Sequence, residues 1–350
     1  MLPNEVTQVG WDVGGAHLKA AALDAAGRPI AALQVPSPLW QGLDRLEAAL
    51  DQALAQLPDG AAAARHAATM TGELADLFAD RGEGVRRIVA TLRQRIAAPL
   101  RVFAGARGFV DPDQAAAFTA DVASANWLAT AQLVAEKLGE GLLVDIGSTT
   151  TDLVAVRAGR IDAGGRTDYE RLSSGELVYT GVVRTSLMAL SDAIEFEGLR
   201  VPLMAEHFAT TADVYRLTGE LDERGDQHPA ADGGEKTLFG SARRLARMIG
   251  RDGRELPMES WQLLAASFRA AQLERIRRAA QQVLLRAAVA PSAPLVAAGS
   301  GSFLVPELAR SLHRPVIEFA RLVDSRIEPV ALSWCAPAVA VALLAQRARA

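Results

Sequence analysis

Two stretches of the chain share one pattern of short apolar runs separated by turns that contain glycine. In the first stretch an apolar run ends at Asp12, a turn passes through Gly14 and Gly15, and further runs cover residues 18–23 and 29–35. Short apolar runs around such turns are typical of neighbouring strands joined as hairpins. The pattern therefore predicts three consecutive strands near the start of the chain.

The second stretch repeats this order about one domain length further along. An apolar run ends at Asp145, a glycine-containing turn follows, and further runs cover residues 151–156 and 160–161. The same order of strands and turns in two places indicates a duplication. We therefore expect two α/β domains, 1–140 and 141–350, with a ligand cleft between them.

Helical spacing and further apolar runs complete both predicted domains. The segment 218–256 is rich in Gly, Asp and Arg and predicts a polar insertion in the second domain, with Arg243, Arg244 and Arg247 on the solvated face of a helix. The other expected elements are helices over 43–57, 85–96, 123–138, 259–288 and 306–312, and strands over 64–70, 100–104 and 294–298.

The most apolar stretch, residues 330–345, contains Ser333 and Pro337. It is shorter than the roughly 20 residues that a membrane helix needs, so we expect a buried C-terminal helix. The single cysteine, Cys335, lies in this stretch among apolar neighbours and is expected to be an unreactive buried thiol. One cysteine and an N-terminal segment without the order of a signal peptide predict a cytoplasmic protein.

Composition and charge exclude several classes of partner. Half of the 350 residues are hydrophobic (50%) and 22% are charged, as in a globular protein. The 37 Lys and Arg residues against 41 Asp and Glu give a net charge of −4, without the basic excess that a nucleic acid or an anionic membrane attracts. We expect small-molecule partners and neither nucleic acid nor membrane, and a homodimer is left open.

The first turn carries groups that suit a phosphate. Gly14 and Gly15 let backbone N–H groups approach phosphate oxygens, Lys19 supplies positive charge, and Asp12 can hold a hydrated Mg²⁺. An ordinary hairpin turn with an aspartate as turn former also explains this segment when it is taken alone.

The second turn strengthens the phosphate interpretation. Residues 145–152 read Asp-Ile-Gly-Ser-Thr-Thr-Thr-Asp and place hydroxyl groups between two carboxylates, directly after a buried run. Carboxylates and hydroxyls gathered at a buried strand end are costly unless a ligand or a metal satisfies them. A turn with local side-chain hydrogen bonds is the alternative.

A third loop follows the predicted strand 294–298, and its glycines can admit a nucleotide or another flat ligand. The predicted ligand-binding residues of the second and third loops are Gly147, Ser148, Thr149, Thr150, Gly299, Ser300 and Gly301.

In this order the three loops resemble the first phosphate loop, the second phosphate loop and the adenosine-type loop of the actin-like, sugar kinase and heat-shock ATPase superfamily. The loop over 145–152 is similar to that of the hydantoinase A/oxoprolinase branch. The resemblance implies two duplicated actin-like (ribonuclease H-like) domains.

Four further segments narrow the resemblance and, together, span most of the chain. They look like short members linked to tetrahydromethanopterin-dependent one-carbon transfer, which are similar to the methanofuran-biosynthesis enzyme that joins a furanmethyl diphosphate to γ-glutamyltyramine. The segments are Met70–Leu74, Ser124–Thr130, Ser174–Gly181 and Phe208–Tyr215.

The resemblance implies a transferase that forms an aryl furanmethyl ether from a furanmethyl diphosphate and a phenolic amine of the tyramine or tyrosine type, in methanofuran or methylofuran biosynthesis. Diphosphate would be the leaving group, Mg²⁺ the cofactor held by Asp12 and Asp145, and ATP or ADP would not be required. The chemistry is sound because a furan ring stabilises positive charge on its methylene, so a phenol oxygen can capture that centre when diphosphate departs.

Other polar residues are candidates for catalysis or substrate binding. Where the related kinases often have a threonine, the chain has Ala16 and His17, which removes a hydroxyl donor and argues against a simple kinase. His17 is a candidate phosphate contact or base, and a structural hydrogen-bonding role is the alternative. The candidate catalytic carboxylates are Asp12, Asp145, Asp152, Glu73 and Glu176, and the candidate substrate contacts are Asn126 and Arg184. For Glu73 and Glu176, a structural carboxylate at a helix N-terminus is the alternative.

Two other classes of function stay open. The same loops support an ATP-dependent small-molecule kinase or a hydantoinase/oxoprolinase-like amide hydrolase. A nucleotide-responsive binding protein without turnover is the third hypothesis. ATP consumption with candidate substrates separates these classes from a transferase that needs no nucleotide.

Overall fold

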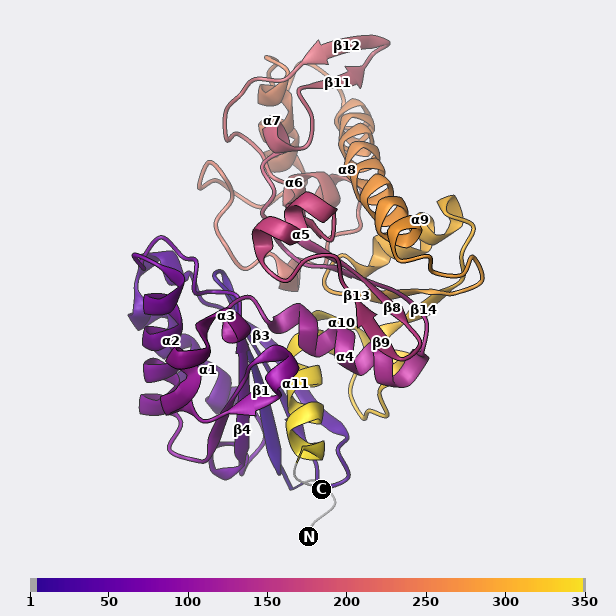
Figure 1. Ribbon diagram of the computed structural model, residues 1–350. Helices are drawn as coiled ribbons and strands as arrows, with labels where there is room; N and C mark the ends of the chain where they lie inside the picture. The colour runs from indigo at the N-terminus through magenta and orange to yellow at the C-terminus, as the bar shows by residue number, and fades with distance from the viewer. Residues whose placement is uncertain (1–4, 349–350) are drawn as a thin grey trace. The chain divides into compact units, whose positions relative to one another are not determined.

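The computed structural model describes residues 5–348, which form two compact α/β units (Figure 1). The first unit consists of the chain up to Glu140, Val156–Ile161 and the chain from Glu318 onward. The second consists of Gly141–Ala155 and Asp162–Ile317.

The sheet of the first unit has the strand order β3-β2-β1-β4-β5-β6. Its central strand β1 pairs antiparallel with β2 and parallel with β4, so the N-terminal hairpin and a later crossover strand meet there. The strands are β1 (Gln8–Val13), β2 (His17–Leu23), β3 (Pro29–Pro36), β4 (Arg65–Met70), β5 (Leu100–Phe103) and β6 (Phe109–Val110).

Different helices cover the two faces of this sheet, with α1 and α2 on one face and α11 on the other (Figure 1). Trp11 of β1 belongs to the core cluster that includes Leu46 of α1 and Ile88 of α2. Gly10 faces α11, because a Cβ on Gly10 would lie 2.8 Å from the Cβ of Ala342. The helices are α1 (Leu43–Gln56), α2 (Arg81–Arg95), α3 (Thr119–Val122), α4 (Asn126–Leu138), α10 (Pro329–Trp334) and α11 (Ala336–Arg347).

The second sheet, whose strands lie mainly in the second unit, has the order β10-β8-β7-β13-β14, with β9 also paired to β8. As in the first unit, three consecutive strands are followed by a later strand, β13, that pairs parallel with the first of them. This repeat confirms the predicted duplication, while the domain limits 1–140 and 141–350 and the cleft stay predictions. The strands are β7 (Gly141–Ile146), β8 (Thr151–Arg157), β9 (Arg160–Asp162), β10 (Leu177–Val178), β13 (Leu295–Ala298) and β14 (Val316–Glu318).

A subdomain of the second unit is built from the chain between β10 and β13. The long helix α8 extends from the sheet to the β11–β12 hairpin (Figure 1), and α6 and α7 pack against it around the buried rings of Trp261 and Phe268. The elements of this part of the chain and its neighbours are α5 (Asp168–Ser174), β11 (Ala193–Phe196), β12 (Leu199–Pro202), α6 (Thr211–Leu217), α7 (Leu238–Met248), α8 (Met258–Arg286) and α9 (Val305–Ser311).

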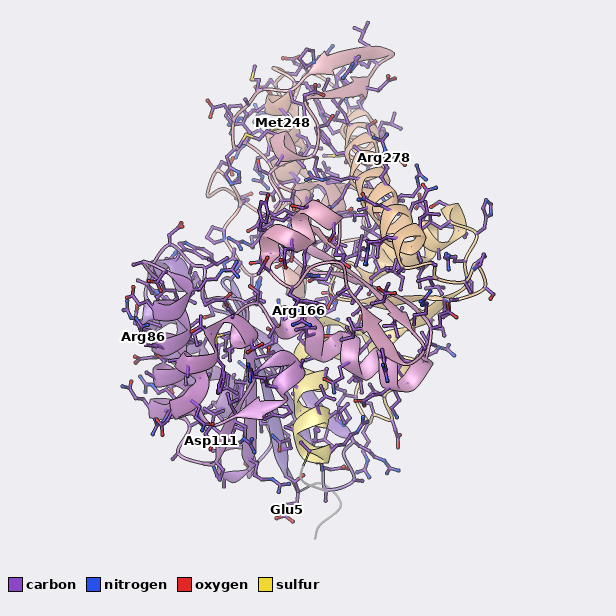
Figure 2. The ribbon with its side chains drawn as sticks, viewed as in Figure 1. Glu5, Arg86, Asp111, Arg166, Met248 and Arg278 are labelled. Atoms are coloured by element: carbon purple, nitrogen blue, oxygen red, sulfur yellow. The ribbon has the colours of Figure 1, made fainter. Side chains whose placement is uncertain are left out.

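The expectation that Arg244 lies on a solvated helix face is wrong. Its side chain is completely buried on α7, where it pairs with Asp213 at 2.7 Å and with Asp232 at 3.1 Å. A buried guanidinium is tolerated only with such carboxylate partners. Arg243 and Arg247 are about 40% exposed, with side-chain accessibilities of 41% and 42%. Elsewhere, charged side chains such as those of α2 and α8 project outward (Figure 2).

The apolar C-terminal stretch is buried, as expected, but it forms two helices instead of one. The chain breaks between α10 and α11 at Cys335, because Pro337 in the first turn of α11 cannot donate a backbone hydrogen bond. Burial raises the pKa of the Cys335 thiol to about 12, which keeps it protonated. Over residues 5–348, no helix combines the length and the apolar character needed to span a bilayer.

Protonation of His66 is expected to destabilise the fold. Trp11 Nε1 donates to His66 Nδ1 at 2.9 Å, and burial lowers the pKa of this imidazole from 6.5 to about 4. The unfolded chain therefore binds this proton more readily than the folded protein does. The stability is fully present above about pH 6.5 and falls as the pH drops towards 4.

Urea denaturation at a series of pH values measures this loss of unfolding free energy. In His66→Gln an amide oxygen that does not titrate replaces the imidazole acceptor, so the variant should lose this part of the pH dependence. An equally steep fall between pH 6.5 and 4 in the variant would assign the effect to other groups.

Candidate functional site

The first predicted loop is a tight turn between β1 and β2. The Gly14 backbone N–H donates to the His17 carbonyl at 3.0 Å and closes the turn. A Cβ on Gly15 would meet no described atom within 4 Å, so there is open space beside this backbone. The side chain of His17 is buried, and its predicted contact with phosphate stays a prediction.

The buried side chain of Asp12 has polar neighbours from three elements. Its Oδ2 lies 3.8 Å from Lys19 Nζ on β2, and its Oδ1 accepts a 3.4 Å hydrogen bond from Asn126 Nδ2 at the start of α4. On β4, Thr69 stands beside Asp12 in the register, and its buried Oγ1 has no hydrogen-bond partner within residues 5–348. The first unit therefore brings Asp12, Lys19 and Asn126 together.

Glu73 follows β4 and is completely buried. Ser124 Oγ donates to its Oε1 at 2.8 Å, and Gly84 packs so closely that a Cβ there would lie 2.7 Å from Glu73 Cα. The neighbouring Gly72 N–H donates to the Val13 carbonyl at 3.0 Å. Glu73 is thus fixed in a loop that packs on the first turn.

The second predicted loop has the same backbone geometry as the first. The Gly147 N–H donates to the Thr150 carbonyl at 2.8 Å, so the first and fourth residues of this turn are also paired. Asp145 is the last residue but one of β7, as Asp12 is of β1. The duplication therefore extends from strand order to the position of each carboxylate.

The third predicted loop packs directly on the end of β7. Gly299 has a φ of +82°, and a Cβ there would overlap Asp145 Oδ1 and the Ile146 carbonyl. The Gly301 N–H donates to that same carbonyl at 2.7 Å. Between the two glycines, Ser300 Oγ is buried and makes no hydrogen bond in the described chain. A polar atom buried without a partner is consistent with a ligand site at this loop.

The segment after β10 covers the second turn from another side. Gly181 lies so close that a Cβ there would overlap the backbone of Ser148 and Thr149. Arg184 Nη1 donates to Thr149 Oγ1 at 3.3 Å, and the Arg184 backbone N–H donates to the Ser148 carbonyl at 2.8 Å. Burial lowers the pKa of the Arg184 guanidinium. A partly buried cation beside hydroxyls and a glycine turn can bind a phosphate group.

Asp152 and Glu176 are held by positively charged partners of their own. Arg171, buried on α5, donates to Asp152 Oδ1 at 2.9 Å. Glu176 accepts hydrogen bonds from the backbone N–H groups of residues 164–165 at 2.6 and 2.9 Å, and from Arg286 Nη2 at 2.5 Å. These contacts favour a structural role for both carboxylates, and their predicted catalytic roles stay predictions.

Each of the two turns has one carboxylate beside it, a type of ligand that hard cations prefer. Within the described residues, no three or more His, Cys, Asp and Glu side chains gather into a metal cluster. Mg²⁺ often uses one or two carboxylates together with water and substrate phosphates, whereas zinc sites need several nitrogen or sulfur ligands. Asp12 and Asp145, each beside a glycine turn, fit the first pattern.

Three residues that were not predicted as site residues lie beside the predicted ones. Thr69 and Ser124 lie near the first turn, and Gly181 lies near the second. Gly181 and Ser124 stand in segments that carry the family resemblance, but spacing alone does not show which loop they touch. The only signal for Thr69 is its place in the expected strand 64–70.

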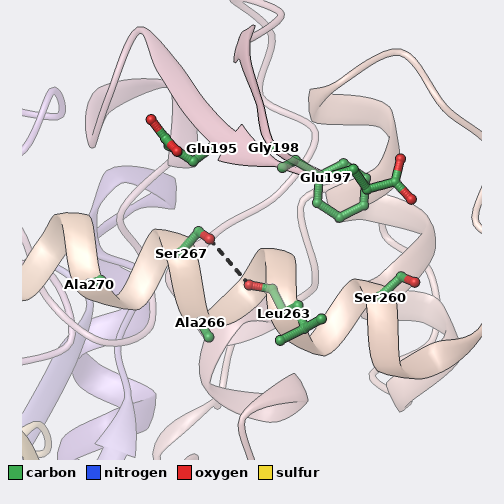
Figure 3. A pocket seen from close by; sticks show the side chains of 9 residues that line it. Glu195, Glu197, Gly198, Ser260, Leu263, Ala266, Ser267 and Ala270 are labelled. Carbon is green, nitrogen blue, oxygen red and sulfur yellow. Dashed lines mark hydrogen bonds between the residues drawn. The ribbon is translucent and has the colours of Figure 1, made fainter.

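A separate open pocket of about 470 Å³ lies between the β11–β12 hairpin and α8 (Figure 3). None of the predicted site residues lines it. Along its α8 side, Ser267 Oγ donates to the Leu263 carbonyl at 3.3 Å, which satisfies that hydroxyl within the helix. The lining residues are Glu195, Phe196, Glu197, Gly198, Ser260, Leu263, Ala266, Ser267 and Ala270.

Comparisons with known proteins match most of the chain. A family model described as Hydantoinase/oxoprolinase matches residues 65–348. A protein of Methanocaldococcus jannaschii, named (4-{4-[2-(gamma-L-glutamylamino)ethyl]phenoxymethyl}furan-2-yl)methanamine synthase, is 33% identical over 245 residues, which cover 70% of this chain and 72% of the relative. The synthase of the same name from Methanococcus vannielii is 32% identical over 123 residues, 35% of this chain and 55% of that protein.

A solved structure shares the fold. The nucleotide-free structure of acetone carboxylase, from a study of ATP-dependent acetone carboxylation, matches with a TM-score of 0.60 and 10% identity, covering 97% of this chain and 70% of that one. Together with the repeated sheets, this likeness confirms the predicted fold class of duplicated actin-like α/β units.

Gly299→Ala is expected to weaken binding of pyrophosphate, because the added methyl group would displace the Asp145 carboxylate and strain the backbone at φ +82°. We expect the Kd for pyrophosphate to rise at least about tenfold, as for the loss of one or two hydrogen bonds. Calorimetric titration with and without Mg²⁺ measures the change.

Gly219→Ala is the matched control. Gly219 also has a left-handed backbone, with φ +74°, but a Cβ there would meet nothing within 4 Å. The control carries the same kind of strain without the overlap. Equal affinities in both variants and the unmodified protein would remove the loop after β13 from the binding site.

Proposed function

The chain belongs to the hydantoinase/oxoprolinase family, and we propose that it is a transferase that forms an aryl furanmethyl ether. The observation that carries this proposal is the 33% identity, over 70% of the chain, to a relative whose name describes a phenoxymethyl group on a furan. The substrates would be a furanmethyl diphosphate and a phenolic amine of the tyramine or tyrosine type, in the assembly of methanofuran or methylofuran.

The reaction exchanges one carbon–oxygen bond for another. The bond between the furan methylene and the diphosphate oxygen breaks, and diphosphate leaves with the electron pair. The phenol oxygen forms the new bond to the methylene and gives its proton to a base. The protein must therefore neutralise the leaving group, align the phenol and accept one proton.

The second unit supplies groups for the leaving diphosphate. The turn Gly147–Thr150 offers backbone N–H groups and hydroxyls, and Arg184 lies beside Thr149 at 3.3 Å. Charge that develops on the departing oxygen is stabilised best by donors already in place. The close packing of Gly181 on this turn, and of Gly299 on the end of β7 just before it, supports such preorganisation.

Asp145 and Asp12 are the proposed ligands of Mg²⁺. When bound, the ion would offset the negative charge of the diphosphate. Around Asp12, Lys19 Nζ lies at 3.8 Å and Asn126 Nδ2 at 3.4 Å. Lys19 limits the negative charge that Asp12 can offer to a cation.

Glu73 is the proposed base for the phenol proton. Ser124 orients its carboxylate, and its loop packs on the first turn. The oxygens of Glu176, in contrast, are occupied by hydrogen bonds from Arg286 and from two backbone N–H groups, which favours a structural role for that residue. Asn126 would bind a polar group of the acceptor substrate.

Turnover is expected without any nucleotide when a furanmethyl diphosphate and tyramine are both supplied, because the diphosphate already activates the methylene. Ether product measured by mass spectrometry should appear in step with released pyrophosphate. The rate should rise with pH as the phenol or its base loses a proton. Product that forms only with ATP, with ADP accumulating in parallel, would replace this proposal by an ATP-dependent enzyme.

Asp145→Asn is expected to lower kcat by a factor of about 100 or more, since loss of a charge-stabilising group costs about 3 kcal/mol in the barrier. Asp192→Asn is the control, because the Asp192 side chain is 88% exposed on the same unit. Steady-state kinetics and circular dichroism on both variants make the comparison. A folded Asp145→Asn variant with normal kcat would exclude this role.

A further inference from the structure

A chain of buried hydrogen bonds joins the second turn to helices α6 and α8. Tyr215 Oη on α6 donates to Gln272 Oε1 on α8 at 2.6 Å. Gln272 Nε2 then donates to Thr180 Oγ1 and to the Gly181 carbonyl, each at 2.8 Å. Both Tyr215 and Gln272 are completely buried.

In this series of hydrogen bonds, each group can act only as a donor or only as an acceptor towards its neighbour. The Gly181 carbonyl is an acceptor only, so the amide nitrogen of Gln272 must face it. The amide oxygen then faces Tyr215, whose hydroxyl must donate. Burial raises the pKa of the Tyr215 phenol far above its ordinary value, so the hydroxyl keeps its proton. The orientation of the amide is therefore fixed.

Gly181 connects this series of hydrogen bonds to the second turn. Its N–H donates to Thr185 Oγ1 at 2.8 Å, and its carbonyl also accepts a 2.8 Å hydrogen bond from Thr211 Oγ1. A Cβ on Gly181 would overlap the peptide between Ser148 and Thr149. Because the two backbones touch without a side chain between them, the position of Gly181 determines that of the second turn.

Tyr215 also contacts the support of the third loop. Its ring packs edge-on against Phe303, with ring centroids 5.2 Å apart and an interplanar angle of 79°. Phe303 lies in the short turn Ser302–Leu304, directly after the Gly299–Gly301 loop. One buried tyrosine therefore touches the residues behind both loops of the second unit.

We propose that Tyr215 and Gln272 are positioning residues that hold the second turn and the third loop in the arrangement that binds the leaving diphosphate. The identity of the ligand rests on the proposed function. Binding by backbone N–H groups needs donors placed to within a fraction of an ångström, and a small displacement weakens several hydrogen bonds together. Tyr215 is the last residue of the segment Phe208–Tyr215, in which no site residue was predicted from the sequence.

The stabilities of single and double variants show whether Tyr215 and Gln272 position the loops or only stabilise the fold. Removing one partner leaves the other buried and unsatisfied, which destabilises the fold. Replacing both partners by apolar groups of similar shape can be nearly neutral for stability. The double change Tyr215→Phe with Gln272→Leu should therefore restore stability relative to Gln272→Leu alone, because no buried Tyr215 hydroxyl is left without an acceptor, while the hydrogen bonds to Thr180 and Gly181 remain lost.

The experiment compares both single variants, the double variant and the control Trp261→Phe. Trp261 is also buried on α8 and donates to the Gly253 carbonyl at 3.0 Å, away from the loops. Calorimetry with pyrophosphate and Mg²⁺ measures affinity, and thermal unfolding measures stability. We expect the affinity to fall about tenfold in Gln272→Leu and in the double variant, and Trp261→Phe to lose stability without losing affinity.

Steady-state ether formation by the same variants gives a second readout. Gln272→Leu and the double variant should show a lower kcat for ether formation, whereas Trp261→Phe should keep the original kcat at temperatures where it is folded.

Three results would overturn the proposal. They are full affinity in the double variant, an equal loss of affinity in Trp261→Phe, and no binding of pyrophosphate by the unmodified protein. An unmodified protein that binds pyrophosphate but forms no ether would refute the proposed function alone, because the affinities still decide whether Tyr215 and Gln272 position the loops.

Discussion

In each unit, backbone hydrogen bonds to the last carbonyl of the central strand hold the candidate loop residues in place. In the first unit the Gly72 N–H donates to the Val13 carbonyl at 3.0 Å, and in the second the Gly301 N–H donates to the Ile146 carbonyl at 2.7 Å. Both donors come from the loop after the neighbouring parallel strand. This bond ties two loops together at a strand end, so the carboxylate one residue earlier, Asp145 in the second unit, lies beside both.

The duplication could be predicted because strands and hairpin turns leave a local record in the sequence. Apolar runs and glycine turns appear in order within about 30 residues, so no long-range contact has to be known. The burial of Arg244 could not be predicted in this way. Its partner Asp213 is 31 residues distant in the chain, and an arginine on an amphipathic helix looks the same with or without that partner.

The roles of the candidate carboxylates could not be predicted from sequence spacing either, because their partners are distant in the chain. Sequence spacing gives Asp145, Asp152 and Glu176 similar standing, since each is next to turn or strand residues. The structure adds the neighbours that spacing does not show: Asp152 and Glu176 have arginine partners at 2.9 and 2.5 Å, and Asp145 lies against the Gly299 backbone. The arginine that Asp152 or Glu176 contacts lies far from it in sequence or in another element, so spacing alone could not reveal the pairing.

The two duplicated turns are supported by different means, and this difference follows from what was inserted after each repeat. Behind the first turn, the Glu73 loop packs against α2 through Gly84, a contact between backbone and a fully buried side chain. Behind the second, the chain between β10 and β13 supplies α6 and α8, whose buried phenol and amide reach the turn through Gly181. A polar link of this kind costs desolvation and is directional, so it fixes a position more narrowly than apolar contact alone. Behind the first turn the directional contact is the 2.8 Å hydrogen bond from Ser124 to Glu73 between two loop residues, whereas behind the second turn, Gly147–Thr150, the contacts extend over two helices.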